Sequence, residues 1–190
     1  MKMETRSLTQ PVEKRAEGQT VAGYAAVFGS TADIGGSFRE VIKAGAFSKT
    51  LKTADVRAYF DHDRGRVLGR VSSGSLRLQE DDKGLAVEID LPDTSDGRDV
   101  RALLERGDLD GMSFGFVVRH DEWDETSDPP TRTIHEIELR EVSVVSEPAY
   151  GDTSIALRSR EERRRVKNFN AAANRLRLKA DLDLKERGQR

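Results

Sequence analysis

The chain has 190 residues, enough for one domain with a hydrophobic core plus charged tails. Charged residues make up 35% and apolar residues 36%, which is polar for a globular protein but not typical of a disordered one. The absence of cysteine excludes disulfides, thiolate metal sites and a cysteine nucleophile. The longest apolar run, 21–28, is too short to span a membrane, and the first residues lack the apolar stretch of a signal peptide. We therefore expect a soluble protein made inside a cell, or one enclosed in a particle assembled there.

Charge is distributed unevenly along the chain. Residues 158–190 contain twelve Lys or Arg and five Asp or Glu, a surplus of seven positive charges. Because the whole chain has a net charge of −2, the preceding residues carry −9. This asymmetry predicts an acidic globular domain over 1–157 and a basic, partly helical or disordered tail over 158–190.

The chain order predicts an α+β fold that is mainly antiparallel β. Alternating and β-branched runs, bounded by turn residues, indicate strands. We expect strands over 3–9, 19–28, 55–60, 66–71, 75–79 and 85–91. Helical spacing and capping residues predict a helix over 94–107, and a shorter one is expected over 46–54.

The last predicted element is a long hairpin from Asp110 to Tyr150, with the polar turn around Ser127. A hairpin symmetric about Ser127 would set Ser113 opposite Glu141, with Cβ atoms roughly 5 Å apart, or about 7 Å if the two were diagonal neighbours. A diagonal offset would leave space for a histidine ring between them. Gly115, on the same side as Ser113, leaves room to approach the hydroxyl. The alternative is a surface serine beside a barrel-corner glycine.

Serine catalysis also requires a histidine base and a group that holds that histidine. The chain has three histidines. His120 and His135 lie toward the far end of the hairpin, several residues from Ser113, so they are expected to be out of reach. His62, at a strand end between two aspartates, is the preferred base. Its alternative role is that of an exposed histidine in an acidic turn.

Several other chemistries are not supported by the motifs. Gly111-Met-Ser-Phe-Gly115 matches the G-x-S-x-G pattern, but a helix precedes this serine and a strand follows it, the reverse of a nucleophile elbow. Asp108-Leu-Asp-Gly111 resembles part of a calcium loop, but Arg106 stands where the first ligand belongs. H-E-x-x-H, phosphate-loop and dinucleotide motifs are missing from the sequence. We therefore expect no cofactor and no catalytic metal.

Five segments in succession resemble the prohead maturation proteases of tailed bacteriophages, over roughly residues 20–157. They are Gly23-Tyr-Ala-Ala-Val-Phe28, His62-Asp63 with Val67-Leu-Gly-Arg70, the segment 97–107, Met112-Ser-Phe-Gly-Phe116, and Leu139-Arg-Glu-Val-Ser-Val-Val-Ser-Glu-Pro-Ala149. That family is related to herpesvirus assemblin, a serine protease with a β-barrel surrounded by helices. The resemblance implies a herpesvirus-protease-like β-barrel with flanking helices and a charged C-terminal tail.

The resemblance also implies the site residues: Ser113 as nucleophile, His62 as general base and Glu141 as the third member. In assemblin the third member is a second histidine. A carboxylate at this position is chemically reasonable, because it stabilises an imidazolium more strongly than a neutral ring does. By analogy, the backbone amides that hold the oxyanion are expected near residues 148–151.

The implied function is a prohead serine endopeptidase that cleaves the scaffold portion of the major capsid protein, or a separate scaffold, and then itself, inside the assembling shell in the host cytoplasm. The basic tail would anchor the protease to acidic scaffold. Its alternatives are nucleic-acid binding, which we rank lower, and a solvated tail without a partner. The oligomeric state is open, with a dimer as one alternative, and no membrane partner is expected. The alternative function is a catalytically inactive capsid-assembly scaffold or chaperone.

Overall fold

The computed structural model describes residues 3–9, 12–14 and 20–146, together with residues 169, 172, 174, 175 and 177. The chain divides into two compact units, Met1–Thr153 and Ser154–Arg190. The five described residues of the second unit are helical and exposed. The predicted domain boundary at 157 lies outside the described residues, so the division into a catalytic domain and a tail stays a prediction.

The first unit is α+β and consists mainly of strands, as predicted. Its described strands pair into a seven-stranded and a four-stranded sheet. The larger sheet contains β1 (Glu4–Thr9), β4 (Thr31–Asp33), β5 (Arg39–Ile42), β6 (Arg57–Phe60), β7 (Asp63–Arg70), β10 (Gly111–Asp124) and β11 (Thr131–Val145). The smaller sheet contains β2 (Glu13–Lys14), β3 (Thr20–Val27), β8 (Leu76–Glu80) and β9 (Gly84–Asp90). These described strands do not close into a single barrel.

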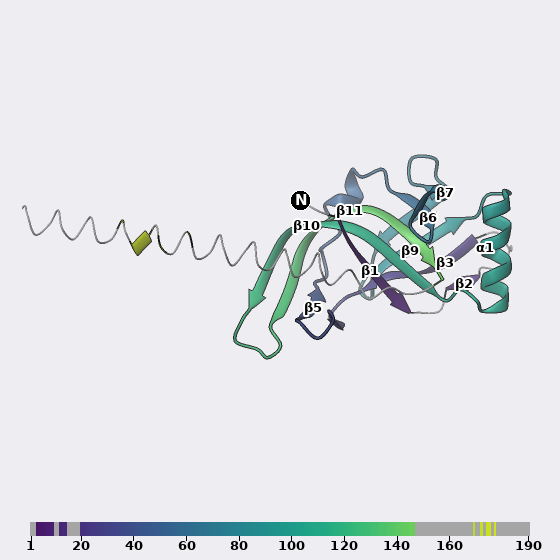
Figure 1. Cartoon of the computed structure of the whole chain (residues 1–190). Helices are drawn as coiled ribbons and strands as arrows, with labels where there is room; N and C mark the ends of the chain where they lie inside the picture. The colour runs from purple at the N-terminus through teal and green to yellow at the C-terminus, as the bar shows by residue number, and fades with distance from the viewer. Residues whose placement is uncertain are drawn as a thin grey trace, which may run out of the picture. The chain divides into compact units, whose positions relative to one another are not determined.

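The long hairpin of β10 and β11 forms the centre of the larger sheet, as the teal and green ribbons in Figure 1 show. β1 pairs with the free edge of β10. On the other edge of β11, β5 pairs near the turn and β6 pairs near the end of the strand. Both of these pairings are parallel, whereas the other described pairings are antiparallel, in line with the expectation of a mainly antiparallel fold. β11 is long enough to accept two partners in succession, and the second of them delivers the segment that carries His62.

Residues from both sheets contribute to one hydrophobic core. Phe114 and Phe116 of β10 stack with ring centroids 4.9 Å apart, and Phe47 meets Phe114 edge-on at 5.7 Å. Val87 and Ile89 of β9 belong to the same cluster. The face of β10 that carries Met112, Phe114, Phe116 and Val118 therefore points into the core, because alternate residues of a strand share one face.

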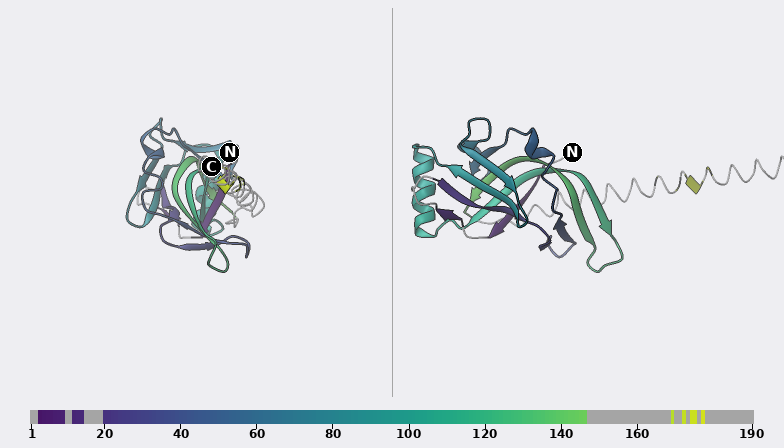
Figure 2. Two further views of the ribbon diagram at one scale, coloured as in Figure 1. Left: turned by 90° about the vertical axis from the view of Figure 1, so that its left-hand side faces the viewer. Right: turned by 180° about the vertical axis from the view of Figure 1, so that it is seen from behind.

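The helix predicted over 94–107 is confirmed as α1 (Ser95–Arg106). The Thr94 side chain accepts a hydrogen bond from the Gly97 amide, and Gly107 ends the helix with φ of 78°. α1 lies at the end of the first unit opposite the β10–β11 turn (Figures 1 and 2). The helix expected over 46–54 is only a short 3-10 turn, η1 (Thr50–Lys52). Serine and threonine are weak helix formers, and Thr50 instead accepts a hydrogen bond from the Leu139 amide of β11.

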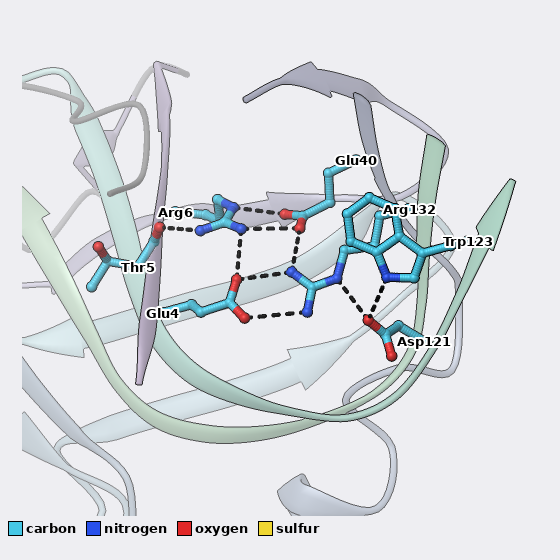
Figure 3. A network of polar contacts seen from close by, with 7 residues as sticks. All are labelled: Glu4, Thr5, Arg6, Glu40, Asp121, Trp123 and Arg132. Atoms are coloured by element: carbon cyan, nitrogen blue, oxygen red, sulfur yellow. Dashed lines mark hydrogen bonds and ion pairs between the residues drawn. The ribbon is translucent and has the colours of Figure 1, made fainter. Parts of the chain in front are cut away.

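A buried network of five charged side chains ties β1 to the hairpin and to β5 (Figure 3). Arg6 Nε lies 2.6 Å from Glu40 Oε1, Arg132 Nη1 lies 2.9 Å from Glu4 Oε2, and Arg132 Nε lies 2.8 Å from Asp121 Oδ2. Burial alone would lower the pKa of Arg6, but the carboxylates of Glu40 and Glu4 together outweigh burial and the pKa is raised. These pairs hold β1 against the strand that carries the candidate nucleophile.

Candidate active site

The register of the β10–β11 hairpin decides how the candidate residues lie. Ser113 is opposite Ser143, and Gly115 is opposite Glu141. The symmetric register, which set Ser113 directly opposite Glu141, is therefore off by two residues, and the diagonal alternative is confirmed. The turn is centred half a residue beyond Ser127, and bulges along the hairpin leave one extra residue on β11. A diagonal offset of about 7 Å is the spacing that accommodates an imidazole between the two groups.

Gly115 is required by the position of the Glu141 carboxylate. A Cβ atom at residue 115 would lie 2.4 Å from Glu141 Oε1 and 3.1 Å from its Cδ. The space beside Ser113, which the glycine was expected to leave open for an approaching group, is thus filled by this carboxylate. Glu141 is buried, with 6% of its surface exposed. Gly115, two residues from Ser113 on the same face of β10, therefore lets the carboxylate of Glu141 from the neighbouring strand lie beside the serine.

His62 is presented by a two-residue hairpin turn between β6 and β7. Phe60 pairs with Asp63, and the two central residues, Asp61 and His62, have φ of 48° and 60°. Positive φ at both positions is what a type I′ turn requires, and it is unfavourable for residues other than glycine. The Asp61 carboxylate accepts a hydrogen bond from the Ser146 amide at 2.7 Å, which anchors the turn to the end of β11. Strained backbone held in this way is common at functional sites.

The turn brings His62 to Glu141 across 79 residues of sequence. His62 Nδ1 lies 2.8 Å from Glu141 Oε1, a distance suited to an Nδ1–H donor. The His62 side chain is 30% exposed, whereas that of Glu141 is 8% exposed. Because the carboxylate engages Nδ1, it selects the tautomer in which Nε2 is the nitrogen able to accept a proton. The partnership of His62 with Glu141 is therefore the arrangement that a histidine base requires.

The second carboxylate oxygen of Glu141 has its own partner. Ser143 Oγ donates a hydrogen bond to Glu141 Oε2 at 2.7 Å, and Ser143 is only 1% exposed. Sequence reasoning missed this residue. The signal was present in the Glu-x-Ser spacing, because residues two apart on a strand share one face.

Ser113 is fully buried, with 0% of its surface exposed, so it is not the surface serine of the alternative interpretation. Its hydroxyl donates to the backbone oxygen of Arg6 on β1 at 2.9 Å, and therefore does not donate to His62. Ser7 on β1 lies opposite Ser113 on the side away from Ser143, so three serines stand in a row across β1, β10 and β11. The structure thus brings His62 and Glu141 into contact and places Ser113 on the neighbouring strand, with its hydroxyl turned toward β1.

The other two histidines lie together nearer the hairpin turn. The rings of His120 and His135 have centroids 5.0 Å apart, and His135 Nε2 lies 3.3 Å from a carboxylate oxygen of Glu122. His120 pairs with Glu136 on β11, whereas Ser113 pairs seven residues further along that strand, at Ser143. This pair forms a separate group of side chains, distinct from the His62 turn.

The backbone amides expected to hold an oxyanion, at 148–151, lie outside the described residues. Within residues 3–9, 12–14 and 20–146 and the five described residues beyond, no group of three histidine or acidic side chains is arranged to hold a metal ion. No helix in that described part is long and apolar enough to cross a membrane.

With this geometry in view, comparisons with known proteins place the chain in a family. The family described as Caudovirus prohead serine protease matches residues 3–169, and the chain belongs to it. The match includes the β6–β7 turn, the hairpin and the residues that follow it.

Two relatives are both named prohead protease. The protein of Enterobacteria phage HK97 is 37% identical over 139 residues, covering 70% of this chain and 57% of its own length. The protein of Escherichia phage T5 is 35% identical over 98 residues, covering 52% of this chain and 43% of its own. The chain therefore spans about half the length of these curated relatives. No solved structure matches it.

Proposed function

We propose that this protein is a serine endopeptidase of prohead maturation, with Ser113 as nucleophile, His62 as general base and Glu141 as the group that orients and stabilises the imidazolium. The observation that carries the proposal is the 2.8 Å contact between His62 Nδ1 and Glu141 Oε1. Glu141 is the diagonal neighbour of Ser113 on the central hairpin, so this contact lies beside the proposed nucleophile. Membership of a serine protease family favours this function over a non-catalytic assembly factor.

The reaction proceeds through an acyl-enzyme. The Ser113 hydroxyl leaves the Arg6 carbonyl, passes its proton to His62 Nε2, and forms a bond from Oγ to the scissile carbonyl carbon. The resulting oxyanion collapses, the C–N bond breaks, and the imidazolium returns the proton to the leaving amine. A water molecule then attacks the ester with His62 again as base, which releases the new carboxyl terminus and regenerates the Ser113 hydroxyl.

Two movements are inherent in this mechanism. The Ser113 side chain has to turn from β1 toward His62, because a hydroxyl has only one proton to donate. A substrate also has to reach a side chain that is fully buried, so a segment that covers Ser113 must shift when substrate binds. Substrate-driven assembly of the reactive arrangement is a common property of enzymes whose resting hydrogen bonds differ from those of the reacting complex.

The substrate that we propose is the scaffold portion of the major capsid protein, followed by the protease itself. Both reactions would take place inside the assembling prohead, in the host cytoplasm. The twelve basic residues of 158–190 suit docking to acidic scaffold, with nucleic acid as the less favoured ligand of the same charge. Competition between scaffold protein and DNA for the tail would separate the two.

We further propose that the two sheets of the first unit correspond to the β-barrel of herpesvirus assemblin, with Glu141 at the position of assemblin's second histidine. The support is that Ser113 and Glu141 lie on adjacent strands of one hairpin, and that Glu141 contacts His62. A carboxylate here gives the imidazolium a full opposite charge, where a histidine would give a dipole.

The test is to incubate the purified chain with its capsid partner and to map new termini by mass spectrometry. Ser113→Ala should keep the fold and abolish cleavage of both capsid protein and the chain itself. Ser7→Ala is the matched control, because it removes a hydroxyl from the neighbouring strand at the paired position. Normal processing by Ser113→Ala would overturn the proposal, and assembly of shells without any cleavage by the parent chain would point to the non-catalytic alternative.

A further inference from the structure

The Glu141 carboxylate is held at both of its oxygens. Oε1 contacts His62 Nδ1 at 2.8 Å, and Oε2 accepts a hydrogen bond from the Ser143 hydroxyl at 2.7 Å. Ser143 follows Glu141 by two residues on β11, so their side chains leave the same face of the strand. Both residues are buried, at 6% and 1% exposure. Hydrogen bonds to a buried carboxylate are therefore poorly replaced by water when one of them is lost.

A glutamate needs such a second anchor more than an aspartate does. Its carboxylate is separated from the backbone by an extra methylene, and its terminal torsion is broad, so one contact through Oε1 leaves the group free to turn. Gly115 adds no side chain that would confine it from the facing strand, since the glycine provides the space in which the carboxylate lies. Among the described residues, the Ser143 hydroxyl donates the hydrogen bond that fixes Glu141 Oε2.

We infer that Ser143 is a positioning residue for the proposed reaction. It holds Glu141 in the rotamer that keeps the His62 proton on Nδ1 and directs Nε2 toward Ser113. Ser143 acts through Glu141 and does not itself exchange a proton with substrate. This inference rests on the proposed function, because it assigns a role within the same catalytic group.

The row of three serines provides a matched control. Ser143 and Ser7 both pair with Ser113, one on each side, and both carry a buried hydroxyl oxygen. They differ in their contacts: Ser143 Oγ donates to Glu141, whereas Ser7 Oγ has no hydrogen-bond partner among the described residues. Removing either hydroxyl deletes the same atom from the position directly paired with Ser113 on a neighbouring strand. Only the loss at Ser143 should affect the histidine.

The experiment compares Ser143→Ala, Ser143→Thr and Ser7→Ala in cleavage of the capsid partner. A hydrogen bond to a charged group, if its loss falls on the transition state, corresponds to about a tenfold or greater decrease in kcat. We expect that decrease for Ser143→Ala with KM unchanged, recovery toward the parent value for Ser143→Thr, and no change for Ser7→Ala. An equal activity of Ser143→Ala and Ser7→Ala would overturn the inference.

A spectroscopic measurement separates positioning from a general loss of structure. The hydrogen-bonded Nδ1 proton of His62 should give a low-field proton resonance at acidic pH in the parent chain and in Ser7→Ala. In Ser143→Ala the resonance should shift or broaden, while thermal unfolding stays cooperative. An unchanged resonance in a folded Ser143→Ala variant would show that the hydroxyl does not hold the carboxylate. This measurement remains decisive if the threonine variant fails to fold.

Failure of the inference is distinguishable from failure of the proposed function. A serine-directed phosphonate should label Ser113 in the parent chain, and peptide mapping by mass spectrometry locates the adduct. Labelling at Ser113 combined with an unaffected Ser143→Ala variant would leave the protease intact and remove only the role of Ser143. An adduct on Ser143 would overturn the positioning role of Ser143 and the assignment of Ser113, because Ser143 would then be the nucleophile.

Discussion

Gly115→Ala tests whether the Glu141 carboxylate has to lie where the structure places it. The new methyl carbon would stand 2.4 Å from Glu141 Oε1, whereas ordinary van der Waals contact begins at 3.4 Å. The carboxylate must therefore retreat by about 1 Å, and a 2.8 Å hydrogen bond to His62 does not survive a displacement of that size. Misplacement of a catalytic group by about 1 Å costs on the order of a hundredfold in rate.

The assay is the rate of capsid-protein cleavage, measured well below the unfolding temperature of each variant. Overpacking costs about 1–3 kcal/mol of stability, so thermal unfolding of Gly115→Ala is recorded alongside. Gly23→Ala on β3 is the control, because its methyl group would meet the flexible end of Met112 at 3.1 Å. We expect Gly23→Ala to keep full activity and Gly115→Ala to lose about a hundredfold while remaining folded.

A double-mutant cycle with Glu141→Gln identifies the route of the effect. If the new methyl group acts by moving the carboxylate, adding Gly115→Ala to Glu141→Gln should cause little further loss. Two losses that multiply would refute this reasoning, as would a fully active Gly115→Ala variant. Glu141→Gln alone should lower the rate less than Ser113→Ala does, because the orienting role proposed for Glu141 contributes less than the role of nucleophile proposed for Ser113.

Three further predictions concern the fold around the site. Arg132→Met removes one of the two cations of the buried network and leaves Arg6 as the remaining guanidinium for three buried carboxylates, so chemical denaturation should show a loss of about 3–5 kcal/mol. Arg98→Met, in an exposed pair, should cost less than about 1 kcal/mol, and equal losses would contradict this. The Arg77 guanidinium lowers the pKa of Asp90 from 3.8 to about 2, so the ionised form stabilises the fold above pH 4 and this contribution fades as pH falls toward 2. Because the pair is exposed, Asp90→Asn should cost less than about 1 kcal/mol at pH 7 and only a small part of that at pH 2, and a pH-independent difference in urea unfolding would refute the linkage. Thr94→Ala removes the cap of α1 and should lower the free energy of unfolding by about 1 kcal/mol without changing cleavage, whereas an unchanged stability would argue against the cap.

The approach of His62 to Glu141 shows what sequence reasoning can and cannot supply. The residue types were identified from the sequence, and the hairpin that carries Ser113 and Glu141 was predicted. The register was wrong by two residues, because it depends on where the turn is centred and on bulges that leave one extra residue on β11. No local signal encodes either feature.

The sequence by itself determined the elements whose signals are local. The cap at Thr94, the stop at Gly107 and the alternation along β10 each act within a few residues, so α1 and the hairpin follow from them. Tertiary structure alone decided which long-range partners meet. The parallel pairing of β6 with β11, the left-handed turn at His62 and the bond from Ser143 to Glu141 depend on strands far apart in the chain. Side-chain contacts of this kind arise only when the backbone of one strand is placed beside another, which is why the candidate residues could be named before their geometry was known.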